Sequence, residues 1–225
     1  MRPLHSLLFV AFLAVSACTV WDPDYEPDPD ASLSDLLGPY ADRAGPIDDV
    51  ERDRLRFAVE RIATRHPGHV ASQVAASALS FQSGESQRAQ GYVDRALSLE
   101  PANIEARCLR IRIAVADGSL DLARKLIDDG LRLRPDAAAL YESSAWVHQL
   151  DGKLEDAMRA LSAAETLDAP TWRTTFHRGL IEELRGNLDE AEKHYRAAQA
   201  ANPDCAEARQ RLAGLAVRRP LKPSR

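Results

Sequence analysis

A 34-residue period runs through most of this chain and constrains its fold more tightly than any other feature of the sequence. Small residues and prolines recur at this spacing in four columns. A fixed period of about 20 to 50 residues is typical of arrays in which each unit packs mainly on its neighbours. The columns contain Gly84, Gly118, Gly152 and Gly186; Ala89, Ala123, Ala157 and Ala191; Ala96, Gly130, Ala164 and Ala198; and Pro67, Pro101, Pro135 and Pro203, with Ala169 and Pro170 at the remaining proline slot.

The period and its landmarks resemble the tetratricopeptide repeat, a helix-turn-helix unit of 34 residues. The best match is the unit 172–205. The resemblance implies an all-α fold, a right-handed superhelical solenoid of antiparallel helix pairs. The residues that carry it stand at the eighth, fifteenth, twentieth, twenty-fourth, twenty-seventh and thirty-second positions of that unit: Gly179, Gly186, Ala191, Tyr195, Ala198 and Pro203.

The period divides residues 70–205 into four full units, with a single helix expected on each side. In the last unit Gly179 is expected where the two helices approach, and Asn187-x-x-Glu190 resembles a capping box that opens the second helix. A motif of the same kind, Asp48-x-x-Glu51, predicts a helix without a regular partner. The expected elements are the flanking helix in 48–69, the units 70–103, 104–137, 138–171 and 172–205, and a capping helix over 206–217.

The N-terminus has the layout of a secretory signal, with Arg2 followed by an apolar run over 7–15. Nine apolar residues are too few for a transmembrane helix, which needs about 20. Residues 15–18 (VSAC) resemble a bacterial lipobox, which implies cleavage before Cys18 and acylation of its thiol. The alternative is ordinary cleavage after Ala17, which leaves Cys18 a free thiol. Thr19 stands where the family's inner-membrane retention signal usually has Asp, so the resemblance implies an outer-membrane lipoprotein facing the periplasm.

Two further segments have biased composition. Residues 18–47 are rich in acids and prolines near their start, which predicts an extended tether. Trp21 and Tyr25 leave room for a docking role there. Residues 218–225 (RRPLKPSR) carry four basic residues and two prolines, which predicts a disordered tail or a contact with an acidic partner.

The sequence contains no phosphate-binding loop, nucleophile elbow or zinc-type cysteine pairs, so we expect no enzyme activity, no cofactor and no metal. A net charge of −5 argues against a nucleic-acid partner. His66 and His69 straddle a turn and are a weak metal pair. Cys108 and Cys205 lie nearly three units apart, too far for the ~7 Å that a disulfide requires between Cα atoms, so we predict no bond between them.

Carried over from the family, the partner groove would be lined by the second, fifth, ninth, twelfth and thirteenth positions of the units. These positions mix aromatic, aliphatic and charged side chains, which suits a helix or extended segment of another protein. The alternative for Phe81, Trp146 and Phe176 is packing in the core. The predicted groove residues are Val74, Phe81, Cys108, Arg112, Val115, Glu142, Trp146, Gln149, Arg173, Phe176, Leu180 and Glu183.

These features together predict a noncatalytic adaptor, anchored by lipid to the outer membrane, that binds an envelope protein in its groove. The resemblance to lipoproteins of similar layout suggests assembly of a type IV pilus or secretion machine. Adaptors for peptidoglycan enzymes and for barrel assembly are alternatives. A soluble periplasmic binding module and a noncatalytic enzyme subunit are alternatives of another class.

Overall fold

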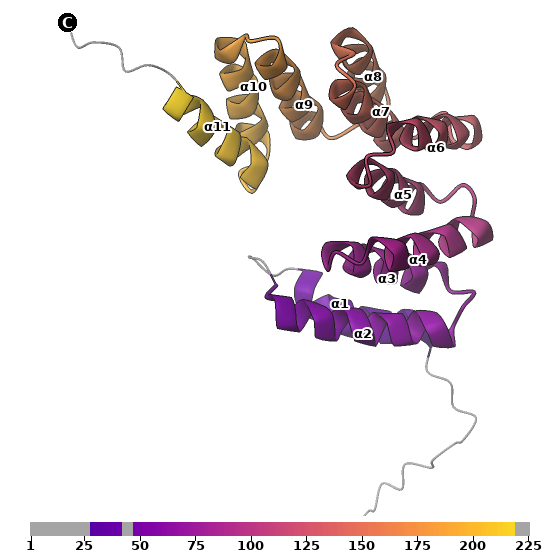
Figure 1. Cartoon of the computed structure of the whole chain (residues 1–225). Helices are drawn as coiled ribbons and strands as arrows, with labels where there is room; N and C mark the ends of the chain where they lie inside the picture. The colour runs from indigo at the N-terminus through magenta and orange to yellow at the C-terminus, as the bar shows by residue number, and fades with distance from the viewer. Residues whose placement is uncertain (1–27, 42–46, 219–225) are drawn as a thin grey trace, which may run out of the picture.

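The computed structural model describes residues 28–41 and 47–218, and these residues form helices without strands. Figure 1 shows the helices stacked in pairs along a curved array, with α1 and α2 at one end and α11 at the other. The predicted all-α solenoid is confirmed. The helices are α1 (Pro29–Ala41), α2 (Asp49–Arg65), α3 (Val70–Gln82), α4 (Ser86–Leu99), α5 (Ile104–Ala116), α6 (Leu120–Leu133), α7 (Ala138–Leu150), α8 (Leu154–Thr166), α9 (Thr171–Leu184), α10 (Leu188–Ala201) and α11 (Ala206–Arg218).

Each 34-residue period contains one helix pair, and the small-residue columns explain why. The glycine column ends the first helix of each pair in a left-handed conformation, with φ of +80° at Gly84 and +83° at Gly186, which other residues adopt only with strain. The alanine column is completely buried, as at Ala89 and Ala191, because the two helices of a pair cross there. The period is therefore a period of turns and helix crossings.

The two predicted capping motifs have different outcomes. Asp48 caps α2, since its carboxylate accepts a hydrogen bond of 2.8 Å from the backbone N–H of Glu51, as predicted. The capping box at Asn187 does not form. The Asn187 side-chain amide instead donates to Glu182 at 2.7 Å, which directs the side chain back toward α9. That part of the sequence interpretation was wrong.

Gly179 lies at a close approach between α9 and α10, but the neighbour is a side chain. A Cβ at this position would lie 2.6 Å from Cε1 of Tyr195, a residue that is completely buried. Gly130 is similar, because a Cβ there would lie 2.4 Å from Cδ of Arg107. These two glycines make room for a large neighbour from the other helix.

Helix α1 corrects the expected tether over 18–47. Residues 29–41 are helical, with Pro29 at the first helical position, where a missing N–H costs nothing. Leu33, Leu36, Leu37 and Tyr40 follow helical spacing and pack in one cluster with α2 and α3. The acidic residues and prolines drew the prediction toward an extended chain, whereas burial of this apolar stripe stabilises a helix.

Of the two flanking helices, only the N-terminal one, α2, is arranged differently from the expectation. Helix α2 was expected to lack a regular partner, but α1 packs against it, so the array begins with a helix pair. Helix α11 extends over the predicted capping segment and one residue further. Its Leu215 is 2% exposed and packs against Tyr195 of α10, while Glu207, Arg209 and Arg211 are exposed.

Several predictions concern residues outside the described ranges. They include the signal segment 1–17, lipidation of Cys18, the tether residues before 28 and over 42–46, and the tail 219–225. Within the described part of the chain, every helix is too short or too polar to span a bilayer.

Candidate functional site

A groove of about 960 Å³ is lined mainly by the first helices of successive pairs. It begins on α3, crosses α5 and α7, and ends between α9 and α11. We call it the partner groove. It is lined by Val74, Ala78, Ile104, Glu105, Cys108, Leu109, Arg112, Ala139, Glu142, Ser143, Trp146, Arg173, His177 and Glu207.

The groove follows the 34-residue period. The second, fifth and ninth positions line it in successive units, as in the series Val74, Cys108 and Glu142 at the fifth position. Six of the predicted groove residues face this groove, Cys108 and five others. The five are Val74, Arg112, Glu142, Trp146 and Arg173.

In the last unit three of the four predicted positions do not line the groove, because α11 packs against them. Phe176 and Leu180 pack in a cluster with Tyr195 and residues of α11. The Tyr195 hydroxyl donates to Glu183 at 2.7 Å, and Arg211 of α11 lies 3.6 Å from the same carboxylate. Phe176, Leu180 and Glu183 therefore stabilise the end of the array in this structure.

The twelfth-position residues of the first three units lie away from the groove lining as well. Phe81 packs at the edge of one apolar cluster, with the Arg112 guanidinium 5.9 Å from its ring centre. Val115 packs at the edge of the next cluster. Gln149 is half-buried, and its Oε1 has no hydrogen-bond partner among the described residues.

Some groove residues were missed by the sequence interpretation. Glu105 and Ala139 stand at the second position, so the period that placed Arg173 also contained the signal for them. Ser143 and His177 stand at the sixth position, which had not been considered. Glu207 comes from α11, and only the fold of the chain end places it beside the groove.

A buried ion pair lies in the middle of the groove. Nη1 of Arg173 donates to Oε2 of Glu142 at 2.9 Å, and the Glu142 side chain is 9% exposed. Burial raises the pKa of Glu142, and the charge and hydrogen bond of Arg173 oppose that shift. The second carboxylate oxygen, Oε1, is buried and has no hydrogen-bond partner among the described residues. Burying such an oxygen is costly unless a donor satisfies it.

The nearby His177 and Cys108 are uncharged at neutral pH. Burial and, to a smaller extent, the charge of Arg173 together lower the pKa of His177 to about 4. Burial raises the pKa of the Cys108 thiol. The Ser143 hydroxyl donates a weak hydrogen bond of 3.7 Å to Sγ of Cys108, which partly offsets that rise. A protonated thiol is a poor nucleophile and a poor metal ligand, so this cluster is suited to binding by shape and polarity.

The described residues contain no group of three or more His, Cys, Asp or Glu side chains placed to hold a metal ion. His69, one half of the weak histidine pair, contacts Asp30 of α1 through Nε2 at 2.9 Å. Cys108 and Cys205 are both free thiols.

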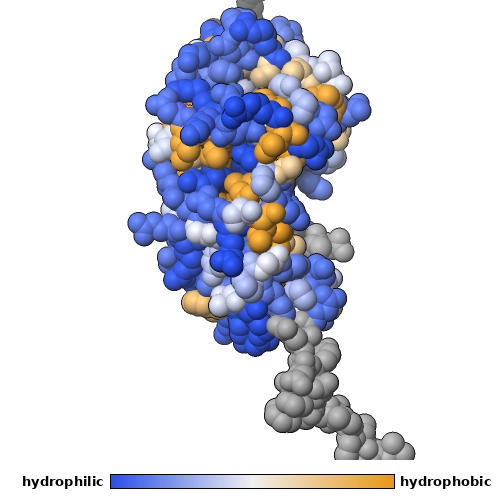
Figure 2. Space-filling model, turned by 90° about the vertical axis from the view of Figure 1, so that its right-hand side faces the viewer, coloured by the Kyte–Doolittle hydropathy of each residue, from blue (hydrophilic) through white to orange (hydrophobic). Residues whose placement is uncertain are grey.

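The face of the molecule seen in Figure 2 is mostly hydrophilic. Its hydrophobic residues are gathered in small, separate patches. Patches of that kind are normal on a soluble surface, so this face gives no indication of a broad apolar docking site.

Models of the tetratricopeptide repeat match the chain over residues 79–138, 108–171 and 172–215, which together are more than half of its length. The chain belongs to the tetratricopeptide repeat family. Proteins of this family generally act as noncatalytic scaffolds that bind other proteins. No curated protein matches the sequence.

Solved structures share the fold at low sequence identity. A thermophilic repeat protein of Thermus thermophilus has a TM-score of 0.72 at 19% identity, covering 84% of this chain and all of that one. PilF of Pseudomonas aeruginosa has a TM-score of 0.56 at 16% identity, covering 66% and 68% of the two chains. MamA of Desulfovibrio magneticus, from residue 41 to its end, has a TM-score of 0.55 at 16% identity, covering 80% and 98%. These likenesses establish the fold alone.

Proposed function

We propose that this protein is a noncatalytic adaptor that binds a segment of an envelope protein in its partner groove. The observation that carries the proposal is the unpaired Oε1 of Glu142, buried in the floor of a groove that also presents Trp146. A donor from a bound segment would satisfy this oxygen, and the indole offers a large apolar contact of the kind that dominates protein interfaces.

The charges of the groove indicate the chemistry of the partner segment. Three carboxylates and two guanidinium groups line the groove. Glu105 and Glu207 are exposed and Glu142 is buried, while Arg173 pairs with Glu142 and Arg112 is exposed beside the Phe81 ring. A helix or extended segment that carries an arginine or lysine beside an apolar residue would match these groups. We expect the cation to reach Oε1 of Glu142 and the apolar side chain to contact Trp146.

Placement of the adaptor at the outer membrane rests on the lipobox-like residues 15–18 with Thr19 after Cys18. The likeness to PilF of P. aeruginosa is compatible with a role in assembly of a pilus or secretion machine. An adaptor for peptidoglycan enzymes or for barrel assembly would use the same groove.

The groove is tested by crosslinking the full chain to its partner in the source cells, followed by affinity measurement with the captured protein. We expect Trp146→Ala and Glu142→Gln each to weaken binding at least tenfold, which corresponds to about 1.4 kcal/mol. Leu133→Ala is the matched control, because Leu133 is 49% exposed on α6 and is not among the residues lining the groove. Unchanged affinity in both groove variants would place the binding site elsewhere.

The anchor is tested separately by membrane fractionation of cells that express the Cys18→Ala variant. The proposal expects loss of the variant from the outer-membrane fraction, since the acyl chains would be missing. Unchanged membrane association would exclude the lipid anchor and leave the groove proposal intact.

A further inference from the structure

A second depression lies outside the partner groove, between α2 and α4 and beside the α2–α3 turn. Two adjoining hollows form it, one of about 440 Å³ and one of about 540 Å³, which share Thr64 and Tyr92. None of their lining residues lines the partner groove. We call it the basic furrow, after four of its lining residues: Arg61, Arg65, Arg88 and Arg95.

The furrow is strongly positive for its size. Four arginines line it against the single carboxylate of Glu60, which lies 3.6 Å from Arg88. Arg61 and Arg65 are exposed and form no ion pair with the described residues. Anionic groups in the furrow would therefore meet guanidinium groups that are not already neutralised.

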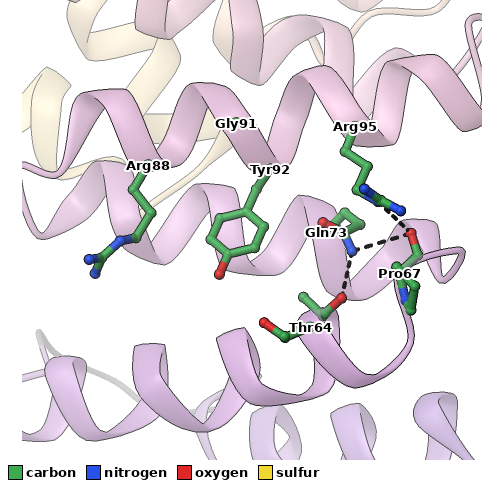
Figure 3. Close-up of a pocket in the computed structure, with 8 residues that line it drawn as sticks. Thr64, Pro67, Gln73, Arg88, Gly91, Tyr92 and Arg95 are labelled. Atoms are coloured by element: carbon green, nitrogen blue, oxygen red, sulfur yellow. Dashed lines mark hydrogen bonds between the residues drawn. The ribbon is translucent and has the colours of Figure 1, made fainter.

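Buried polar groups shape the floor of the furrow. Figure 3 shows Arg95 and Gln73 converging on the carbonyl of Pro67, with distances of 2.9 Å from Nε of Arg95 and 3.5 Å from Nε2 of Gln73. Nε2 of Gln73 also donates to the carbonyl of Ala63 at 2.8 Å. Gln73 is 1% exposed, yet its Oε1 has no hydrogen-bond partner among the described residues. The floor thus holds an unsatisfied acceptor, and the nearby guanidinium of Arg95 is held by the carbonyl of Pro67.

The furrow is particular to the first repeat. Gly91 leaves space in the wall of the furrow, since a Cβ there would meet nothing within 4 Å. Glycine is also unfavourable in the interior of a helix such as α4. In the later units the position equivalent to Gly91 carries a long basic side chain. The positions equivalent to Arg88 and Arg95 carry no arginine. Gly91 corresponds to Lys125, Arg159 and Lys193; Arg88 to Leu122, Asp156 and Glu190; and Arg95 to Asp129, Ala163 and Ala197.

The chain itself contains a segment whose chemistry complements the furrow. Residues 22–27 (DPDYEP) alternate three carboxylates with two prolines and a tyrosine, and they lie outside the described residues. Their carboxylates would pair with the arginines, and a backbone N–H could donate to Oε1 of Gln73. Proline-rich chains dock on exposed aromatic rings at low entropic cost, and Tyr92 and Phe57 line the furrow.

The described residues also place the end of this segment near the furrow. Asp30, in the first turn of α1, lies 2.9 Å from Nε2 of His69. His69 follows Pro67 in the α2–α3 turn, and Pro67 lines the furrow. Six extended residues reach about 20 Å, whereas the stretch of α2 from Phe57 to Arg65 measures about 12 Å. The segment is therefore long enough to turn around the loop and run along the furrow.

We propose that the acidic segment, residues 22–27, binds in the basic furrow of its own chain. This contact would hold the start of the mature chain against the first repeat. It would also shorten the free tether between Cys18 and the array. It is independent of what the partner groove binds.

A peptide competition experiment on the full chain, in mild detergent, tests the proposal. The probe is a fluorescent peptide with the sequence of residues 19–28, followed by anisotropy. In the variant Asp22→Asn, Asp24→Asn, Glu26→Gln, the furrow is expected to be vacant and to bind the peptide. In the wild-type chain the native segment, at an effective concentration of about 1 mM, is expected to weaken peptide binding at least tenfold.

Charge reversal locates the binding site. Adding Arg61→Glu and Arg65→Glu to the variant with the three neutralised acids should weaken peptide binding at least tenfold. Neither arginine forms an ion pair with the described residues, so the substitutions break no ion pair that holds α2. Lys125→Glu with Arg132→Glu on α6 makes the same change of charge as a control and should leave binding intact.

Three outcomes would overturn the proposal. One is that the variant with the three neutralised acids does not bind the peptide at a peptide concentration of about 1 mM. Another is peptide binding that survives reversal of Arg61 and Arg65. The third is equal binding to the wild-type and neutralised chains, with loss on charge reversal, which would show that the furrow takes an acidic segment from another protein.

Discussion

At the scale of single residues, Gly179 and Gly91 show two different reasons for a glycine within a helix. The ring of Tyr195 occupies the space where a side chain at Gly179 would lie, whereas the space around Gly91 is open. The sequence gives the same letter at both positions. Only the neighbour across the helix crossing separates a packing requirement from an opening in the surface.

Substitution of the two glycines by alanine should therefore have opposite effects. Gly179→Ala forces the Tyr195 ring to move and is expected to lower the free energy of unfolding by about 1–3 kcal/mol. Gly91→Ala is expected to raise it by about 0.5–1 kcal/mol, because alanine favours a helix interior. Urea unfolding followed by circular dichroism measures both. A stable Gly179→Ala variant would contradict the observed contact.

The half-buried His177 predicts a dependence of stability on pH. Its pKa is about 4 in the folded chain, against about 6.5 in an unfolded one, so the unfolded state binds the proton more readily. This contribution to stability is complete above pH 6.5 and is lost as the pH falls to about 4, where the loss is about 3 kcal/mol. The raised pKa of Glu142 acts in the opposite direction over acidic pH.

The variant His177→Gln isolates this contribution, because glutamine does not titrate. We expect its free energy of unfolding to fall less than that of the wild-type chain between about pH 7 and pH 4. The same urea titration at several pH values measures the difference. Parallel curves for the two proteins would contradict a depressed pKa.

At the scale of elements, α1 shows how an apolar stripe overrides a biased composition. Leu33 is 8% exposed and packs with Leu55 and Val59 of α2, although it lies in a segment rich in acids and prolines. The spacing of Leu33, Leu36, Leu37 and Tyr40 was a readable helix signal. It was missed because the prolines on both sides were given more weight.

Leu33→Ala should destabilise the first helix pair by about 2–3 kcal/mol, since it removes a buried side chain at a helix contact. Ser34→Ala is the control, because Ser34 is exposed on the same helix. Hydrogen exchange of α1 and α2 measures the local effect. Equal protection in the two variants would show that α1 does not pack on the array in solution.

At the scale of the whole molecule, stability is distributed along a line of neighbouring pairs. The apolar clusters lie one after another, from Leu33 and Leu55 at one end to Tyr195 and Leu215 at the other. Stability in such an array is approximately a sum of unit and nearest-neighbour contributions. A local defect should therefore remain local.

Leu215→Glu places a charge in the last contact of the array and should release α11 from α9 and α10. We expect faster hydrogen exchange in α9–α11 and exposure of Phe176 and Tyr195, with unchanged protection of α3–α6. The matched control is Val217→Glu, because Val217 is 86% exposed on the same helix. A loss of protection along the whole chain would indicate a single cooperative core.

Spacing along the chain is enough to predict the solenoid and half of the groove. Turn glycines, crossing alanines and the second, fifth and ninth positions all recur within one helix pair. Tertiary structure decided the rest. Phe176, Leu180 and Glu183 had the right spacing for the groove, but α11 packs over them, and nothing in their own unit encodes that neighbour. The basic furrow likewise joins residues of α2 and α4, which face each other only when consecutive pairs stack. The repeat pattern predicts which side chains each unit directs toward the groove, whereas the neighbouring helices determine which of those side chains remain exposed.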